Sequence, residues 1–190
     1  MTTQSIWRTR AIALLAVLPL PVPTHTQATR PAQIILLRHA EKPADPDNPH
    51  LSKAGVKRAQ QLVPFIKTNP AMTKFGLPVA VFATQTTKDH DGQRTQETVK
   101  RLARTLKLKV KTPCLGKDYE KLAKLILASP AYDKKTVLIC WNHKEISPLA
   151  AALGVTPEPP KWKKRVFDQV YVISYRKGKA ALTTCRYDCK

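Results

Sequence analysis

The chain has 190 residues, of which 43% are hydrophobic, and this composition favours one globular domain over a disordered or multidomain chain. It carries 33 Lys and Arg residues against 13 Asp and Glu residues, so its formal net charge is +20. A surface this basic attracts anions such as phosphate esters, anionic polymers or anionic surfaces, although basicity can also serve only solubility.

Residues 1–28 have the features of a secretory signal peptide. Arg8 and Arg10 form a positive n-region, a short apolar core follows, and Thr26-Gln27-Ala28 is an acceptable cleavage site. The apolar run is too short to cross a bilayer comfortably. We therefore predict a secreted or periplasmic protein whose mature domain spans residues 29–190, without a transmembrane helix. The alternatives are an uncleaved anchor and a leader on a cytosolic protein.

Four cysteines, Cys114, Cys140, Cys185 and Cys189, fit an oxidising compartment. Cys185 and Cys189 are close enough in sequence to form a disulfide at the C-terminus, but four cysteines allow three full connectivities. Cys140 lies inside an apolar run and is expected to be a buried free thiol. Since no C-x-x-C motif occurs, we predict no zinc site.

The first predicted strand ends in an Arg-His pair. Ile34–Leu37 is a run of four aliphatic residues, typical of a strand buried on both faces, and Arg38 and His39 follow it directly. Ligands of open α/β sheets bind at the carboxyl ends of the strands. The pair is therefore well placed for chemistry on an anion.

A helix is predicted after a loop rich in Pro and Asp at 42–50. Ser52 is a plausible N-cap, and apolar residues recur at helical spacing as far as Ile66. Pro64 conflicts with an unbroken helix, so we expect a kink or an early end there.

The remaining pattern alternates between strands and helices. The predicted strands are 79–84, a short one from 108 to 110, 136–141, 170–173 and 181–185, and the predicted helices start near Arg94 and span 118–127 and 146–153. Such alternation is typical of an α/β fold with helices on both faces of the sheet. The last strand follows a turn and should form an antiparallel edge. We therefore predict a three-layer α/β/α sandwich with a mostly parallel central sheet.

Polar side chains that follow different strands, far apart in the sequence, are expected to meet at one edge of this sheet. His39 follows the first strand, His143 follows strand 136–141, and Arg94 begins a helix after the second strand. Two imidazoles, two guanidiniums and a helix N-terminus would form a pocket for a tetrahedral oxyanion. There a neutral imidazole can attack phosphorus, the cations can stabilise the charge that develops, and a carboxylic acid can protonate the leaving oxygen. No metal or cofactor is required for such a step.

These motifs resemble those of the histidine phosphatase superfamily (phosphoglycerate mutase-like). The resemblance rests on Leu37-Arg38-His39, Leu51-Ser52-x-x-Gly55-x-x-Arg58-Ala59, Arg94-x-x-x-Thr98 and His143 after a late apolar strand, and it covers nearly all of residues 33–175. It implies that His39 is the nucleophile. It also implies that Arg38, Arg94 and His143 bind and stabilise the phosphoryl group.

The proton donor is less clearly marked. One branch of the superfamily has an Asp directly after the second His, whereas this chain has Lys144 and then Glu145, which we take as the acid. The other branch takes a Glu from the segment after the second Arg, where Asp118 and Glu120 are the alternatives.

Two further residues are assigned to substrate binding. Thr84, at the end of the second strand, can donate to a phosphate, and Lys42 can guide an anion toward the pocket. Each could equally be structural or solvated.

The resemblance implies a metal-independent phosphatase that acts on phosphate monoesters or phosphoanhydrides through a phosphohistidine on His39. The chain has little room for lid insertions, and an open site suits phosphoproteins, polyphosphates or exposed sugar phosphates. The alternative is a catalytically weak or inactive protein that binds phosphate or polyanions.

Overall fold

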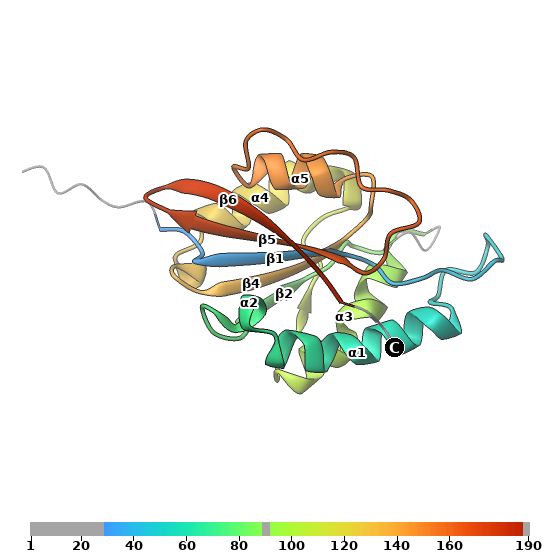
Figure 1. The fold of residues 1–190 in the computed structure, drawn as a ribbon. Coiled ribbons are helices and arrows are strands. Elements are labelled where there is room, and N and C mark those ends of the chain that lie inside the picture. The colour runs from blue at the N-terminus through green and yellow to red at the C-terminus, as the bar shows by residue number, and fades with distance from the viewer. Residues whose placement is uncertain (1–28, 89–91, 188–190) are drawn as a thin grey trace, which may run out of the picture.

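The computed structural model describes residues 29–88 and 92–187, which fold around a six-stranded sheet of order β3-β2-β4-β1-β5-β6 (Figure 1). The strands are β1 (Gln33–Arg38), β2 (Ala80–Phe82), β3 (Val110–Lys111), β4 (Thr136–Trp141), β5 (Gln169–Arg176) and β6 (Lys179–Arg186). Neighbours from β3 to β1 are parallel, while β5 and β6 are antiparallel. The predicted mostly parallel sheet with an antiparallel edge is confirmed.

Helices cover both faces of the sheet (Figure 1). They are α1 (Lys53–Thr68), α2 (Pro70–Thr73), α3 (Gln93–Thr105), α4 (Tyr119–Ala128) and α5 (Ile146–Ala152), with short 3-10 turns η1 (Gly116–Asp118) and η2 (Pro130–Tyr132). Figure 1 shows α1 and α3 on one side of the sheet and α4 and α5 on the other. The three-layer architecture is therefore as predicted.

The central strand β1 supplies side chains to two separate cores. Ile34 and Leu36 pack with α4 and α5, whereas Ile35 and Leu37 pack with α1 and α3. Successive side chains of a strand point to opposite faces, so a strand covered on both faces must be apolar throughout. This requirement explains the uninterrupted aliphatic run before Arg38.

Some boundaries differ from the predicted ones. Strand β2 is confined to Ala80–Phe82, and the helix expected over 118–127 starts as η1 and continues as α4. We expected Pro64 to kink or end α1 early, but the helix continues to Thr68. Pro64 is exposed, and so is Gln60, whose carbonyl lacks a backbone N–H partner at position 64.

The start of α1 is bound to the loop that follows β1. Ser52 is the N-cap, as predicted, and its side chain accepts a hydrogen bond from the Gly55 N–H at 3.1 Å. The Ser52 N–H donates to the Glu41 carbonyl at 3.0 Å. A Cβ on Gly55 would lie 2.3 Å from that same carbonyl oxygen, so only glycine permits this close approach.

Several predictions concern residues outside those described. They include the signal peptide over 1–28 and the Cys185–Cys189 disulfide. Within the described part, the Cys140 thiol is fully buried in β4, and burial raises its pKa well above the usual range. Across residues 29–88 and 92–187, we find no helix with the length and apolar character needed to span a bilayer.

Candidate active site

Strands β1 and β4 bring the two predicted histidines to one edge of the sheet. The strands pair in parallel with Arg38 opposite Trp141, and the His39 N–H donates to the Trp141 carbonyl at 3.2 Å. His143 follows β4 at the same edge. A pocket of about 590 Å³ opens there. It is lined by Arg38, His39, Glu41, Lys42, Pro43, Ala44, Arg94, His143, Lys164, Arg165 and Phe167.

His39 is held in one tautomer. Its Nδ1 lies 2.7 Å from the Ala40 carbonyl oxygen, which can only accept, so Nδ1 carries the hydrogen. Nε2 then keeps its lone pair. The side chain is only 7% exposed, and burial lowers its pKa from 6.5 to about 4; the Ala40 bond opposes this shift, while Arg38 and other cations add to it. At neutral pH, His39 is therefore an uncharged base.

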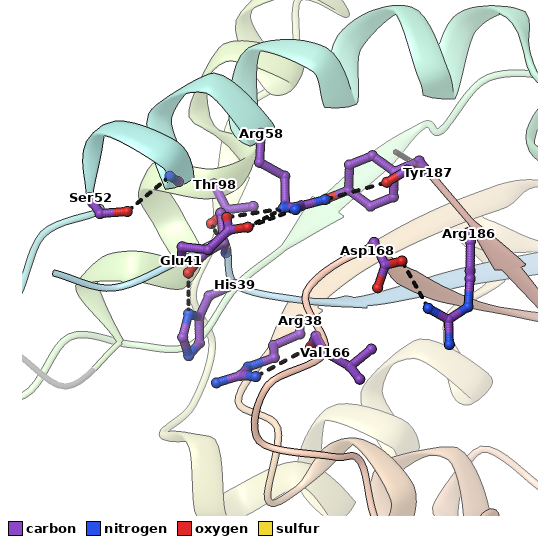
Figure 2. Close-up of polar contacts among 12 residues, drawn as sticks. Arg38, His39, Glu41, Ser52, Arg58, Thr98, Val166, Asp168, Arg186 and Tyr187 are labelled. Atoms are coloured by element: carbon purple, nitrogen blue, oxygen red, sulfur yellow. Dashed lines mark hydrogen bonds and ion pairs between the residues drawn. The ribbon is translucent and has the colours of Figure 1, made fainter. Parts of the chain in front are cut away.

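Arg38 is built into the wall beside it (Figure 2). Its Nη1 donates to the carbonyls of Lys164 at 2.6 Å and Val166 at 3.2 Å, and its guanidinium carbon lies 3.9 Å from the centre of the Phe167 ring. Burial lowers its pKa to about 10, so it remains a cation at neutral pH. Among the described residues, nothing accepts a hydrogen bond from its buried Nε. A ligand oxygen could satisfy this donor.

His143 is a second neutral imidazole in a positive field. Burial is the main cause that lowers its pKa from 6.5 to about 4, and the nearby charges of Arg38, Lys144 and Lys164 contribute to the same shift. A site with this much positive charge favours an anionic ligand, whose binding would relieve the repulsion among the cations.

The start of α3 contributes Arg94 and a brace for the His39 loop. Arg94 lies in the first turn, and its Nη1 donates to the Asn48 carbonyl at 2.9 Å. One turn later, the Thr98 hydroxyl accepts a hydrogen bond from the Ala40 N–H at 2.9 Å. The Arg94-x-x-x-Thr98 spacing thus places a cation in the pocket and a hydroxyl against the backbone beside His39.

Glu41 lines the pocket, but both of its carboxylate oxygens are engaged (Figure 2). The Arg58 Nε donates to Oε1 at 2.8 Å and to Oε2 at 3.0 Å. This half-buried pair links α1 to the loop after His39. Among the described residues, Glu41 is the only acidic side chain that lines this pocket.

The other predicted site residues line different hollows. Thr84 and Glu145 lie in a neighbouring hollow of about 310 Å³, which Asn142 also lines. The Thr84 hydroxyl is buried and 2.7 Å from the hydroxyl of Thr95. The alternative acids, Asp118 and Glu120, line a third hollow beside α4. The structure therefore brings together Arg38, His39, Arg94, His143 and Lys42, and it sets the predicted acids and Thr84 apart from them.

Solved structures with this architecture include members of the histidine phosphatase superfamily. The proposed phosphohistidine phosphatase SixA of Agrobacterium tumefaciens has a TM-score of 0.54 and 16% identity, and the match covers 84% of this chain and all of that one. The alpha-ribazole phosphatase of Shigella flexneri has a TM-score of 0.52 and 16% identity, and the match covers 82% of this chain and 96% of that one.

This protein has the histidine phosphatase fold. The resemblance expected from the sequence motifs is thus confirmed at the level of the fold. The proposed SixA of Nakamurella multipartitia agrees, with a TM-score of 0.52, 17% identity, and a match that covers 84% of this chain and 97% of that one. By sequence, no family model and no curated protein matches the chain.

Sequence reasoning missed one wall of the pocket in this histidine phosphatase fold. Lys164, Arg165 and Phe167 come from the loop before β5, to which the sequence analysis assigned no role. The loop is joined to the site by hydrogen bonds from Arg38 to the carbonyls of Lys164 and Val166, which lie 126 and 128 positions further along the chain. The local cluster of basic residues at 161–165 is the signal that could have indicated it.

Proposed function

We propose that this protein is a phosphatase that hydrolyses phosphate monoesters or phosphoanhydrides through a phosphohistidine intermediate on His39. One observation carries the proposal: the bond from Nδ1 to the Ala40 carbonyl directs a free Nε2 into the pocket that Arg38, Arg94 and His143 share. The histidine phosphatase fold supports it independently, because a solved structure with the same architecture is that of a proposed phosphohistidine phosphatase.

In the first step, Nε2 of His39 attacks the phosphorus, and the bond from phosphorus to the leaving oxygen breaks. The lowered pKa of His39 favours this step because the imidazole need not lose a proton first. Arg38 and Arg94 stabilise the negative charge on the phosphoryl oxygens. The unpartnered Nε of Arg38 supplies one of the hydrogen bonds.

In the second step, water attacks the phosphohistidine. The bond between phosphorus and Nε2 breaks, and its electron pair returns to the imidazole. His143, a neutral imidazole on the same pocket wall, can donate a hydrogen bond to a phosphoryl oxygen. We propose that the cationic pocket performs both steps without a metal ion, since the guanidiniums supply the charge that a metal would otherwise provide.

Glu145 remains our proposed proton donor for poor leaving groups, and its position defines how to test it. It lies in the hollow next to the pocket, and its carboxylate would have to reach the leaving oxygen past His143. Glu145→Gln should slow hydrolysis of alkyl phosphates far more than that of an aryl phosphate, whose leaving group needs no proton. Equal losses on both substrates would exclude this role.

The central test is to trap the intermediate. The protein is mixed with an aryl phosphate in the presence of a chelator and quenched in alkali, where phosphohistidine survives, and the phosphorylated peptide is mapped by mass spectrometry. We expect the label on His39. We also expect His39→Ala to lower kcat by at least about a thousandfold.

His50→Ala is the matched control, because it removes an exposed histidine outside the pocket. Its kcat should equal that of the wild type. No turnover by wild type or His39→Ala, together with salt-sensitive binding of polyanions, would instead identify the non-catalytic binding protein.

We also propose that the enzyme works outside the cytoplasm, in a secreted or periplasmic form. The proposal rests on the signal-like features of residues 1–28. In that setting its substrates are phosphorylated small molecules or phosphoproteins that reach the same compartment.

A further inference from the structure

The outer rim of the His39 pocket is basic. Lys42, from the loop after β1, and Lys164 and Arg165, from the loop before β5, line this rim, and all three residues are exposed. Lys42 and Lys164 both contribute to the lowered pKa of His143, which places their charges close to the reacting groups. Because the carboxylate of Glu41 is neutralised by Arg58, these cations are not compensated within the pocket.

The pocket is larger than the group that His39 would accept. Its volume of about 590 Å³ falls in the range of sites that enclose a whole small-molecule ligand rather than one phosphoryl group. The transferred group would occupy the inner end, beside Arg38 and Arg94. The rest of the substrate would then lie among Lys42, Lys164 and Arg165, which favours a second anionic group there.

The inner end of the pocket also lacks a free acid within the described chain. Glu41 is engaged by Arg58, and Glu145 lies in the neighbouring hollow. An alkoxide is a strong base and needs a proton as it leaves. A phosphate leaving group is a much weaker base, with an ionisation near pH 6, and nearby cations can stabilise it without protonation.

We infer that the preferred substrate is a phosphoanhydride, in which the leaving group is itself a phosphate held by Lys42, Lys164 and Arg165. This inference rests on the proposed function and narrows its substrate class. Inorganic oligophosphates and nucleoside polyphosphates share this chemistry.

The reaction balances without an added acid. Nε2 of His39 forms a bond to the terminal phosphorus, the bond from phosphorus to the bridging oxygen breaks, and its electron pair leaves on the shortened phosphate chain. Water then adds through its oxygen, and the pair of the nitrogen–phosphorus bond returns to Nε2. The product leaves as dihydrogen phosphate, which loses a proton to solvent, and His39 is again neutral with its hydrogen on Nδ1.

The test compares four substrates in the presence of a chelator: tripolyphosphate, a nucleoside triphosphate, an aryl phosphate and an alkyl phosphate. We expect kcat/KM to be highest for the two anhydrides. The double variant Lys164→Ala/Arg165→Ala should lower kcat/KM for the anhydrides about tenfold or more, and the value for the aryl phosphate much less. Alanine keeps the Lys164 carbonyl that holds Arg38, so the inner pocket should be preserved.

The matched control is Arg176→Ala/Lys179→Ala. It removes the same charges from the paired ends of β5 and β6, at the edge of the sheet opposite the pocket. It should leave the preference for anhydrides unchanged. A preference for tripolyphosphate would indicate inorganic oligophosphates as the substrates, and a preference for the nucleoside triphosphate would indicate nucleoside polyphosphates.

Two results would overturn the inference in different ways. If the alkyl phosphate is hydrolysed as well as the anhydrides, or if the Lys164/Arg165 variant loses activity equally on all substrates, the inference is wrong while the proposed function stands. If wild type and His39→Ala show the same rate on every substrate, the proposed function fails and the inference with it.

Discussion

At the scale of single residues, the protonation states in the pocket follow from burial. The pKa values of His39 and His143 are both lowered to about 4, chiefly because folding removes water from around the two imidazoles. The positive neighbours act in the same direction. A nucleophile that is neutral well below pH 7 is suited to attack phosphorus without help from a base.

These pKa values can be measured directly. In an NMR titration of the free protein, the His39 imidazole should take up its proton near pH 4. In the unfolded chain the pKa of His39 is 6.5. The contribution of neutral His39 to the free energy of unfolding is therefore complete above pH 6.5 and falls as the pH decreases toward about 4. A His39 titration near 6.5 would contradict the proposal that His39 is a buried, neutral nucleophile.

At the scale of elements, the loop after β1 is held from two sides. The start of α1 binds it through Ser52 and the Arg58–Glu41 pair, and α3 binds it through the hydroxyl of Thr98 (Figure 2). Two helices that are distant in sequence therefore fix the backbone on either side of Ala40. The orientation of His39 depends on this packing.

Gly55→Ala tests that dependence. Helix propensity alone predicts that alanine would stabilise α1 by about 1 kcal/mol. The new Cβ would meet the Glu41 carbonyl at 2.3 Å, so we expect a loss of about 1–3 kcal/mol in the free energy of unfolding and a lower kcat on an aryl phosphate. Urea denaturation and initial rates measure both effects. A stabilised, fully active variant would show that the close contact is unimportant.

Pro64→Ala tests the opposite case within the same helix. Pro64 is exposed, so its replacement removes little packing and restores an N–H that can bond within α1. We expect the free energy of unfolding to rise by about 1–2 kcal/mol, with unchanged kcat. A lower melting temperature would mean that proline stabilises the chain through a contact or through the unfolded state.

At the scale of the whole molecule, the main features are the net charge and the proposed export. The described domain presents a strongly basic surface, and the pocket lies where several of its cations converge. Such a field attracts anionic substrates from solution and weakens as salt increases. A signal peptide would deliver this charged enzyme to a compartment outside the cytoplasm.

Export of the full chain is testable by mass. When the 190-residue chain is produced in a bacterial host, we expect periplasmic or secreted protein whose intact mass corresponds to cleavage after Ala28. The same chain with Arg8 and Arg10 replaced by Glu should be exported poorly, because the positive n-region is lost. Cytosolic protein with its leader intact would contradict the predicted localisation.

The order of elements and the main contents of the pocket could be predicted from sequence. Buried parallel strands require continuous apolar runs, so the run before Arg38 and the one before Asn142 mark two strand ends that face the same edge. Helix α3, which carries Arg94, follows β2, and β2 lies next to β4 in the sheet. These are local patterns combined with simple topology, which is why His39, Arg94 and His143 could be placed together.

Only the tertiary structure decided where the acidic side chains lie relative to the pocket and which loop forms its remaining wall. Glu41 is locked to Arg58, while Glu145 faces a neighbouring hollow although it lies two residues from His143. The loop with Lys164 and Phe167 encloses Arg38 across more than a hundred residues of chain. Such placements depend on side-chain direction and long-range packing in irregular segments, which have no periodicity for a sequence pattern to reveal.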